Sequence, residues 1–405
     1  MATSGQDTGL DTVEEPLYEH VDFHMGPQHP STHGVLHLEL TVDGETVIDC
    51  RPDVGYLHTG MEKLAESKLY YQVTPITDRM DYLSPMTNNL AWCLSVEKLL
   101  GIEVPPRGQF IRVLLSELSR LNSHLVWAGT NGLDVGALSM IMFGFREREM
   151  ILEIFDEVAG QRMNPSYMTP GGIWCDINEE TFIPKVRQFL DEFPSRLADY
   201  HRILTKNPIW RARLKGVGIL DAETCEQYAI TGPMLRAAGV DYDVRKQEPY
   251  SSYDQFDFDV PVRDGADCFD RYLNRMDEMA ESWRICRQII DNIPPGRWTT
   301  EDRRVALPPR DLIHKDMHAM IHHFWIIYNG YSPPKGQAYV PIESPKGEIG
   351  FFVVSDGTNK PLRMRVRPPS LINLQALPEM VRGGMIADTV ACIASTDIVL
   401  GEVDR

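Results

Sequence analysis

Two histidines in the string MGPQHPSTHG have the type and setting of proton-transfer groups. His29 and His33 stand four residues apart in a loop that is restricted by Pro27 and Pro30 and ends at Gly34. An imidazole gains or loses a proton near neutral pH, and loops commonly present such groups to a ligand. The alternative is that both rings only bond the local backbone. The residue types alone leave both interpretations open.

A second group of polar side chains directly precedes a predicted helix. The string DRMDYLS contains Asp78, Arg79, Asp81, Tyr82 and Ser84, and a serine followed by proline is typical of a helix start. A helix start favours nearby carboxylates, which would make the group a charged cap. A phenol beside carboxylates can also exchange protons with a ligand. The pattern therefore predicts either a cap or a reaction site.

A row of charged side chains is expected on the predicted helix 108–128. Glu117, Arg120 and His124 are spaced three and four residues apart, so they share one helical face between rows of leucine. Charges on a core helix must be paired, because an unpaired buried charge is strongly destabilising. The row indicates either a structural ion network or part of a path that moves protons or tunes a redox centre.

Two further patterns are weaker. Asp134 lies in the string NGLDVGA, which is typical of a turn, and it would join the chemistry only through a histidine partner. His314, His318 and His322 recur every four residues on one predicted helix, a spacing that a zinc site can use. No HExxH motif and no neighbouring cysteine accompanies them, so we expect no metal site in this chain.

The cysteines and glycines argue against several kinds of cofactor. The seven cysteines are scattered, and no two lie within three residues, so the thiolate spacing of an iron–sulfur cluster or a structural zinc site is missing. Neither nucleotide-binding glycine motif occurs. A redox role would therefore use electrons and nucleotides that other chains bind.

Composition narrows the setting of the chain. Its 405 residues carry a formal net charge of −18, which disfavours nucleic acid because phosphate backbones would repel it. No apolar run approaches the ~20 residues of a membrane span. The polar, acidic start lacks the features of a signal or transit peptide. We expect a cytoplasmic chain that reaches a membrane only through partners.

Hydrophobic periodicity predicts the elements that hold these groups. A hairpin is predicted over residues 35–50 around Asp43-Gly44. The other predicted elements are helices over 61–72, 85–100, 108–128, 138–159, 180–204, 265–292 and 310–328, and strands over 337–342, 349–355 and 361–367. This is an α+β chain with a central helical bundle flanked by small β-containing N- and C-terminal parts. The expected divisions are an acidic tail 1–20, a β-hairpin part with the histidine loop 21–60, a helical core 61–330 and a C-terminal β-containing part with a tail 331–405.

Several long, irregular strings give the chain a specific resemblance. The strings GPQHPSTHGVL, LHTGMEKLAESK, DRMDYLSPM, RVLLSELSRLNSHL, ESPKGEIGFFVVSDG and the terminal DIVLGEVDR are similar to stretches of the 49 kDa, or D, subunit of respiratory complex I. The resemblance runs from about residue 20 to the last residue. That family is related to the large subunit of nickel–iron hydrogenases, so the resemblance implies a hydrogenase large-subunit-like fold.

In those hydrogenases two C-x-x-C pairs hold the nickel and the iron. The matching frames of this chain place Asp81 and Ser84 at the early cysteine positions, and Val399 and Glu402 at the late ones. All four thiolates are absent, and a nickel–iron centre needs such soft ligands. The resemblance therefore implies a cavity without its metals, and in the complex I family this region binds the quinone headgroup.

The resemblance also implies roles for individual residues. His33 and Tyr82 correspond to the pair that hydrogen-bonds the two quinone oxygens, and Asp134 corresponds to the aspartate that partners the histidine. The implied neighbours of the quinone are His29, Asp81, Ser84 and Val399. The residues implied to face the terminal iron–sulfur cluster of a partner subunit are Arg79, Glu117, Arg120 and His124.

The implied function is that of the quinone-binding core subunit of a proton-translocating NADH–quinone oxidoreductase. This chain would protonate quinone to quinol with electrons from a partner's iron–sulfur cluster, while partner subunits bind NADH and FMN. The implied partners are that cluster subunit, other peripheral-arm subunits and a membrane-arm subunit at the quinone entrance, on the cytoplasmic side of the bacterial plasma membrane. The alternatives are an active hydrogenase, a non-catalytic scaffold that docks the cluster subunit to the membrane arm, and a related complex fed by ferredoxin or a deazaflavin.

Overall fold

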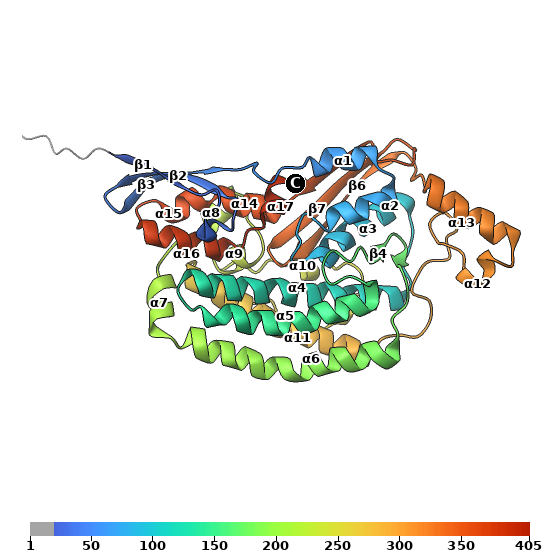
Figure 1. Cartoon of the computed structure of the whole chain (residues 1–405), viewed down its shortest axis with the longest axis horizontal. Coiled ribbons are helices and arrows are strands. Elements are labelled where there is room, and N and C mark those ends of the chain that lie inside the picture. The colour runs from blue at the N-terminus through green and yellow to red at the C-terminus, as the bar shows by residue number, and fades with distance from the viewer. Residues whose placement is uncertain (1–19) are drawn as a thin grey trace, which may run out of the picture.

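The long helices form one bundle around a central helix. The computed structural model describes residues 20–405. Helices α4 (Pro106–Asp134), α5 (Ser139–Ala159), α6 (Glu179–Tyr200) and α11 (Cys268–Asp291) run side by side, and α4 contacts both α5 and α11 (Figure 1). Both the leucine rows and the charged row of α4 are buried, because neighbours cover it on several sides. The predicted α+β class with a central helical bundle is confirmed.

The N-terminal strands form a small antiparallel sheet. Strands β1 (Val21–Met25), β2 (His37–Asp43) and β3 (Thr46–Asp53) pair in the order β1-β2-β3. The β2–β3 hairpin confirms the prediction, with Gly44 in its turn at a φ of +61°. The sequence does not predict β1, because its first four side chains are all exposed and show no apolar alternation.

The second sheet packs against helix α3 (Pro85–Leu100). Its strands β6 (Gly336–Ser344), β7 (Gly347–Ser355) and β8 (Arg363–Arg367) are antiparallel and lie close to the predicted bounds. Helix α3 contacts both β6 and β7 (Figure 1). A connection of two residues joins β6 to β7, so Lys346 stands in a tight turn at the end of this sheet.

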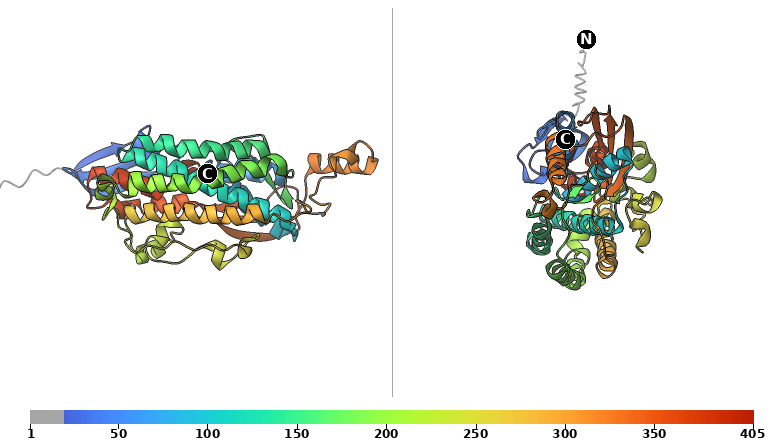
Figure 2. Two further views of the ribbon diagram at one scale, coloured as in Figure 1. Left: turned by 90° about the horizontal axis from the view of Figure 1, so that it is seen from below. Right: turned by 90° about the vertical axis from the view of Figure 1, so that its right-hand side faces the viewer.

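Four short helices end the chain and join the two sheets to the bundle. These are α14 (Pro369–Gln375), α15 (Leu377–Val381), α16 (Ile386–Thr396) and α17 (Leu400–Asp404). Helix α15 contacts β3, α14 contacts β7 and α16 contacts α4. The two β-containing parts are therefore connected through a C-terminal layer on one side of the bundle (Figures 1 and 2).

The remaining elements are short. The helix predicted over 61–72 is wrong in its bounds: it is divided into α1 (Met61–Ser67) and α2 (Tyr70–Thr77), because Lys68 and Leu69 have extended backbone angles. The other elements are the 3-10 turns η1 (Pro30–Thr32) and η3 (Tyr253–Gln255), the π-helical turn η2 (His201–Thr205), the strands β4 (Met168–Thr169) and β5 (Gly172–Ile173), and the helices α7 (Pro208–Leu214), α8 (Ala222–Gln227), α9 (Pro233–Arg236) and α10 (Val244–Gln247).

Two helices project from the body as an arm. Helices α12 (Arg310–Ile313) and α13 (Met317–Asn329) lie beyond the end of the bundle (Figures 1 and 2). Asp316 caps α13 by accepting the N–H of His318 at 3.1 Å, so the single helix predicted here is wrong. The three regularly spaced histidines consequently do not share one helix, and no group of three or more His, Cys, Asp or Glu side chains within residues 20–405 is arranged to hold a metal ion.

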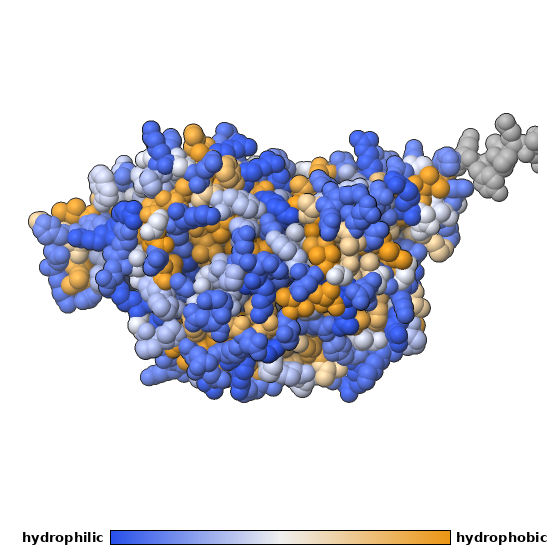
Figure 3. All heavy atoms as spheres, turned by 180° about the vertical axis from the view of Figure 1, so that it is seen from behind, coloured by the Kyte–Doolittle hydropathy of each residue, from blue (hydrophilic) through white to orange (hydrophobic). Residues whose placement is uncertain are grey.

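The surface is mostly hydrophilic with separate apolar areas. Figure 3 shows these areas among charged side chains on the back face of the molecule. On α13 the side chains of Phe324, Trp325 and Tyr328 are exposed. No helix in the described part of the chain is long and apolar enough to cross a membrane. The expected acidic tail lies outside the described residues, except for its last position.

Candidate functional site

His33 is fixed by a tight loop and by a segment near the end of the chain. It follows the turn η1 and has a φ of +52°, in the left-handed region. Its Nδ1 lies 3.3 Å from the carbonyl oxygen of Ile398, and because a carbonyl only accepts, Nδ1 carries the proton of this hydrogen bond. Its Nε2 is buried without a hydrogen-bond partner within residues 20–405. The ring is therefore held through one nitrogen and can bind a ligand through the other.

Tyr82 stands in the turn that leads into α3. Oδ1 of Asp81 accepts the N–H of Leu83 at 3.1 Å and that of Ser84 at 3.3 Å, so this carboxylate fixes the turn. Tyr82 is partly buried. Burial and the charge of Asp81 raise the pKa of the Tyr82 phenol, and Lys346 lowers it, with a net rise. The cap and the site interpretations are thus compatible: Asp81 forms the cap, and the phenol keeps its proton at neutral pH.

One short segment contacts both side chains. We call residues 398–402 the closing turn. The carbonyl of Ile398 in this turn binds His33, as described above. A Cβ atom at Gly401 would stand 2.8 Å from a backbone oxygen of the turn before α3, and 3.5 Å from Cε1 of Tyr82. The closing turn therefore brings His33 and Tyr82 against the same piece of backbone.

Asp134 is the last residue of α4, which continues beyond its predicted end. The predicted turn position is thus a helix terminus, because the helix is covered by α5 along this stretch. Burial lowers the pKa of the His33 imidazole, and the negative charge of Asp134 raises it, with a net fall. Burial raises the pKa of Asp134, and His33 lowers it, with a net rise. The two groups therefore influence each other's protonation.

The four positions that match the metal-binding cysteines are buried. Asp81, Ser84, Val399 and Glu402 are each at most 2% exposed. Oε2 of Glu402 accepts the N–H of Ser370 at 3.2 Å and also its hydroxyl. Burial, followed by the charge of Asp81, raises the pKa of Glu402 to about 7. A serine, a valine and two carboxylates do not fit a nickel–iron centre, which argues against the hydrogenase alternative.

A buried lysine faces one of these positions. Nζ of Lys346 lies 3.1 Å from Oδ2 of Asp81 and donates to Oγ of Ser123 at 2.7 Å. Burial lowers the pKa of Lys346, but the charges of Asp397, Asp81 and Glu402 raise it, and the net direction is upward. Sequence reasoning misses this residue, because a lysine in a two-residue turn between strands is ordinarily exposed. The only signal is its place in the string ESPKGEIG.

The charged row of α4 is buried and paired, as the sequence predicts. Glu117 lies 3.2 Å from Nε of Arg120 and 3.1 Å from Nη1 of Arg245. Nε2 of His124 lies 3.0 Å from Oε2 of Glu278. All members of the row are at most 1% exposed, so they do not contact a partner directly.

The partners of this row come from distant parts of the chain. Arg236 donates to Glu278 at 3.1 Å and to Glu343 at 2.8 Å, and Arg245 donates to Asp243 at 2.6 Å. Sequence reasoning misses them, because they lie in loops, short helices and a strand without a pattern that points to α4. We call the following eight residues the buried ionic network: Glu117, Arg120, His124, Arg236, Asp243, Arg245, Glu278 and Glu343.

Two of the expected site residues lie at the surface. Arg79 is exposed, and its Nη1 lies 2.5 Å from the carbonyl oxygen of Pro75. It is therefore accessible to a partner, unlike the buried row of α4 with which the resemblance groups it. His29 is also exposed, and its Nδ1 accepts the N–H of Ser31 at 3.2 Å. For His29 the structure supports the local-backbone interpretation.

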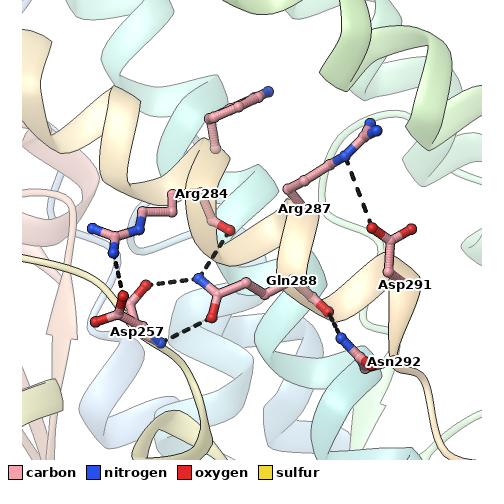
Figure 4. A pocket seen from close by; sticks show the side chains of 7 residues that line it. Asp257, Arg284, Arg287, Gln288, Asp291 and Asn292 are labelled. Carbon is pink, nitrogen blue, oxygen red and sulfur yellow. Dashed lines mark hydrogen bonds and ion pairs between the residues drawn. The ribbon is translucent and has the colours of Figure 1, made fainter.

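A hollow on the outer side of α11 is separate from these residues. Figure 4 shows that its side chains bond one another. Arg284 pairs with Asp257, and Nε2 of Gln288 donates to the carbonyl of Asp257 at 2.7 Å. None of the predicted site residues lines this hollow. We therefore place the candidate site at the closing turn.

The sequence of nearly the whole chain is similar to known proteins. Residues 134–405 match the sequence model of the family described as "Respiratory-chain NADH dehydrogenase, 49 Kd subunit". The chain is 52% identical over 381 residues to the first D-type subunit of NADH-quinone oxidoreductase from Solibacter usitatus, which covers 94% of this chain and 93% of that protein. It is 50% identical over 387 residues to the D-type subunit of NADH-quinone oxidoreductase from Geotalea uraniireducens, which covers 96% and 99%.

The chain therefore belongs to the family of 49 kDa subunits of respiratory-chain NADH dehydrogenase. This confirms the family that the strings of the sequence indicate.

Proposed function

We propose that this chain is the quinone-reducing core subunit of a proton-translocating NADH:quinone oxidoreductase. Its curated relatives are named as D-type subunits of NADH-quinone oxidoreductases, and they match it over nearly its full length. The observation that carries the proposal is the position of His33 and Tyr82. Both lie against the closing turn, one with a buried, unbonded nitrogen and one with a partly buried phenol.

The chemistry of quinone reduction fits these two side chains. Quinone takes two electrons and two protons to become quinol. Tyr82 donates the proton of its phenol to one quinone oxygen. His33 uses its Nδ1–H for the carbonyl of Ile398, so only its doubly protonated form can donate through Nε2 to the other oxygen. The negative charge of Asp134 stabilises that form. The tyrosinate and neutral imidazole that remain are then reprotonated.

The electrons and the membrane contact come from partner subunits in this proposal. An iron–sulfur cluster subunit next to the site delivers the electrons, other peripheral-arm subunits bind NADH and FMN, and a membrane-arm subunit borders the quinone entrance. The absence of close cysteine pairs and of nucleotide motifs in the sequence supports this division. We place the chain on the cytoplasmic side of the bacterial plasma membrane, where it is attached through its partners.

The test is NADH-driven reduction of a long-chain quinone in membranes that carry Tyr82→Phe. We expect normal assembly on a native gel and a fall in kcat of at least tenfold, about 1.4 kcal/mol of barrier, because the proton donor is removed without a change of shape. Tyr228→Phe is the matched control, since it removes another partly buried phenol at a distance in the chain.

The non-catalytic scaffold predicts a different result. A scaffold tolerates the loss of one hydroxyl, so a Tyr82→Phe complex that assembles and turns over like the wild type would replace our proposal with that alternative.

A further inference from the structure

Beyond the pair that meets the quinone, the structure assigns a role to a residue outside the predicted site. We propose that Lys346 is a positioning residue for quinone reduction, holding Asp81 and the Tyr82 turn in place and supplying a fixed positive charge at the former metal-ligand positions. This inference rests on the proposed function above.

The fold places the ammonium group of Lys346 with little freedom. The residue is 0% exposed and stands in the two-residue connection between β6 and β7. Its backbone N–H lies 3.3 Å from Oγ of Ser344, and its carbonyl accepts from Nδ2 of Asn373 at 3.2 Å. The next residue, Gly347, has a φ of +136°, and a Cβ there would stand 2.9 Å from the carbonyl of Thr231. Both sides of the turn are therefore fixed, and the side chain is directed inward.

Lys346 and the backbone share the carboxylate that shapes the Tyr82 turn. Oδ1 of Asp81 accepts two backbone N–H groups of that turn, while Oδ2 lies 3.1 Å from Nζ of Lys346. The same ammonium donates to Ser123 on α4 at 2.7 Å. Lys346 thus joins the end of the second sheet, the central helix and the turn that carries Tyr82.

The surroundings of Lys346 contain more buried negative than positive groups. Asp81, Asp397 and Glu402 all act on it electrostatically. Oδ2 of Asp397 and Oε1 of Glu402 are buried without a hydrogen-bond partner in the described residues. The other nearby cation is Arg275, whose Nε lies 3.8 Å from Asp397 and whose guanidinium packs 4.5 Å from the centroid of the Trp127 ring.

This charge distribution matters when electrons reach a quinone. Negative charge that arrives before the protons are transferred would be repelled by these carboxylates at short range. A cation that is fixed before the reaction stabilises such charge in a buried site without any rearrangement. Lys346 provides this cation next to the Tyr82 turn, although it does not itself donate to the quinone.

The experiment compares two variants of the whole complex in membranes. Lys346→Met removes the charge and leaves Asp81 unpaired. The double variant Asp81→Asn with Lys346→Met removes both charges, keeps the approximate shape and leaves no buried unpaired ion. Lys360→Met, at an exposed lysine near β8, is the control. The readouts are assembly on native gels and separate kcat and KM values for a long-chain quinone.

We expect the double variant to assemble, to keep KM within about threefold and to lose at least tenfold in kcat. Lys346→Met alone should lose at least as much, through lower assembly or lower kcat. A double variant with wild-type turnover would overturn the inference, because Lys346 would then only neutralise Asp81. A double variant that does not assemble would also overturn it, since the pair would then serve folding alone.

Tyr82→Phe measured in parallel separates the two proposals. If Tyr82→Phe is fully active, the proposed function fails whatever Lys346 does. If Tyr82→Phe is impaired while the double variant is fully active, only the inference about Lys346 fails.

Discussion

The buried ionic network and the region of the closing turn both contain buried charges, but they differ in how those charges are bonded. In the network, Glu117 accepts from Tyr253 at 2.6 Å and Ser282 at 2.7 Å, in addition to its arginine partners. At the closing turn, buried polar atoms lack a hydrogen-bond partner within residues 20–405, and these atoms include Nε2 of His33, Oδ2 of Asp397 and Oε1 of Glu402. Unused hydrogen-bonding capacity costs stability, so its concentration around one turn is expected where a ligand or water completes the bonds.

The same contrast is found in the pKa values of the carboxyl groups. Burial alone would raise the pKa of Glu278 in the network, but Arg236 and His124 lower it below its usual range. Asp243 behaves in the same way, with its pKa lowered to about 2. At the closing turn, burial and Asp81 raise the pKa of Glu402 to about 7. The network therefore holds fixed ions, whereas the closing turn holds a group that can change its protonation near neutral pH.

The largest effect is expected when a fixed ion of the network is removed. Arg236→Met would leave Glu278 and Glu343 without their shared partner in the interior. Breaking a buried ion pair on one side costs about 3–5 kcal/mol, so we expect the complex to assemble poorly and to lose its structure at a lower temperature. Native gels after heating in steps measure both effects.

A matched control for this prediction is Arg284→Met. Arg284 is 37% exposed and pairs with surface carboxylates, and exposed pairs contribute less than about 1 kcal/mol. If Arg236→Met assembles and resists heat as well as the control does, the network is not the structural element that we describe.

A smaller effect is expected from a steric change at the closing turn. Gly401→Ala would place a Cβ 2.8 Å from the carbonyl of Met80 and 2.9 Å from that of Arg79, so the Tyr82 turn must move. We expect the complex to assemble, with quinone reduction lowered about tenfold, or about 1.4 kcal/mol, because misplaced groups react slowly.

Gly336→Ala is the control for the closing turn. The nearest atom to a Cβ at Gly336 would be 3.9 Å away, and its φ is not in the left-handed region. Wild-type turnover in Gly401→Ala would show that the contact between the closing turn and Tyr82 does not position the phenol.

The sequence predicts the scaffold of these regions better than their contacts. Helical spacing correctly places Glu117, Arg120 and His124 on one face and requires that they be paired. It does not reveal Arg236 or Glu278 as partners, because these residues meet α4 only through the packing of the bundle. Ion pairing between distant segments leaves no periodic signal in the sequence.

The candidate site shows the same limit. The residue types alone do not separate His33 from His29, and only the resemblance distinguishes them before the structure shows one ring partly buried and the other exposed. Lys346 is not predicted at all, since its role depends on the inward direction of one turn. The break before α13 is missed because the capping by Asp316 competes with a helical pattern that continues through it.

The smallest effect is expected from the charge that supports His33. Asp134→Asn removes the negative charge that raises the pKa of the imidazole, while burial continues to lower it, so this pKa falls further. If the imidazolium form of His33 donates to quinone, kcat declines as pH rises through that pKa, and the variant moves this decline to lower pH. At neutral pH we expect kcat about threefold below wild type, about 0.7 kcal/mol, with Asp311→Asn, an exposed aspartate of α12, unchanged. Measuring kcat from pH 5.5 to 8.5 checks the direction. A decline that stays in place, or moves to higher pH, would mean that Asp134 does not act through the protonation of His33, and the distinction between fixed and exchangeable charge would have to be drawn without this pair.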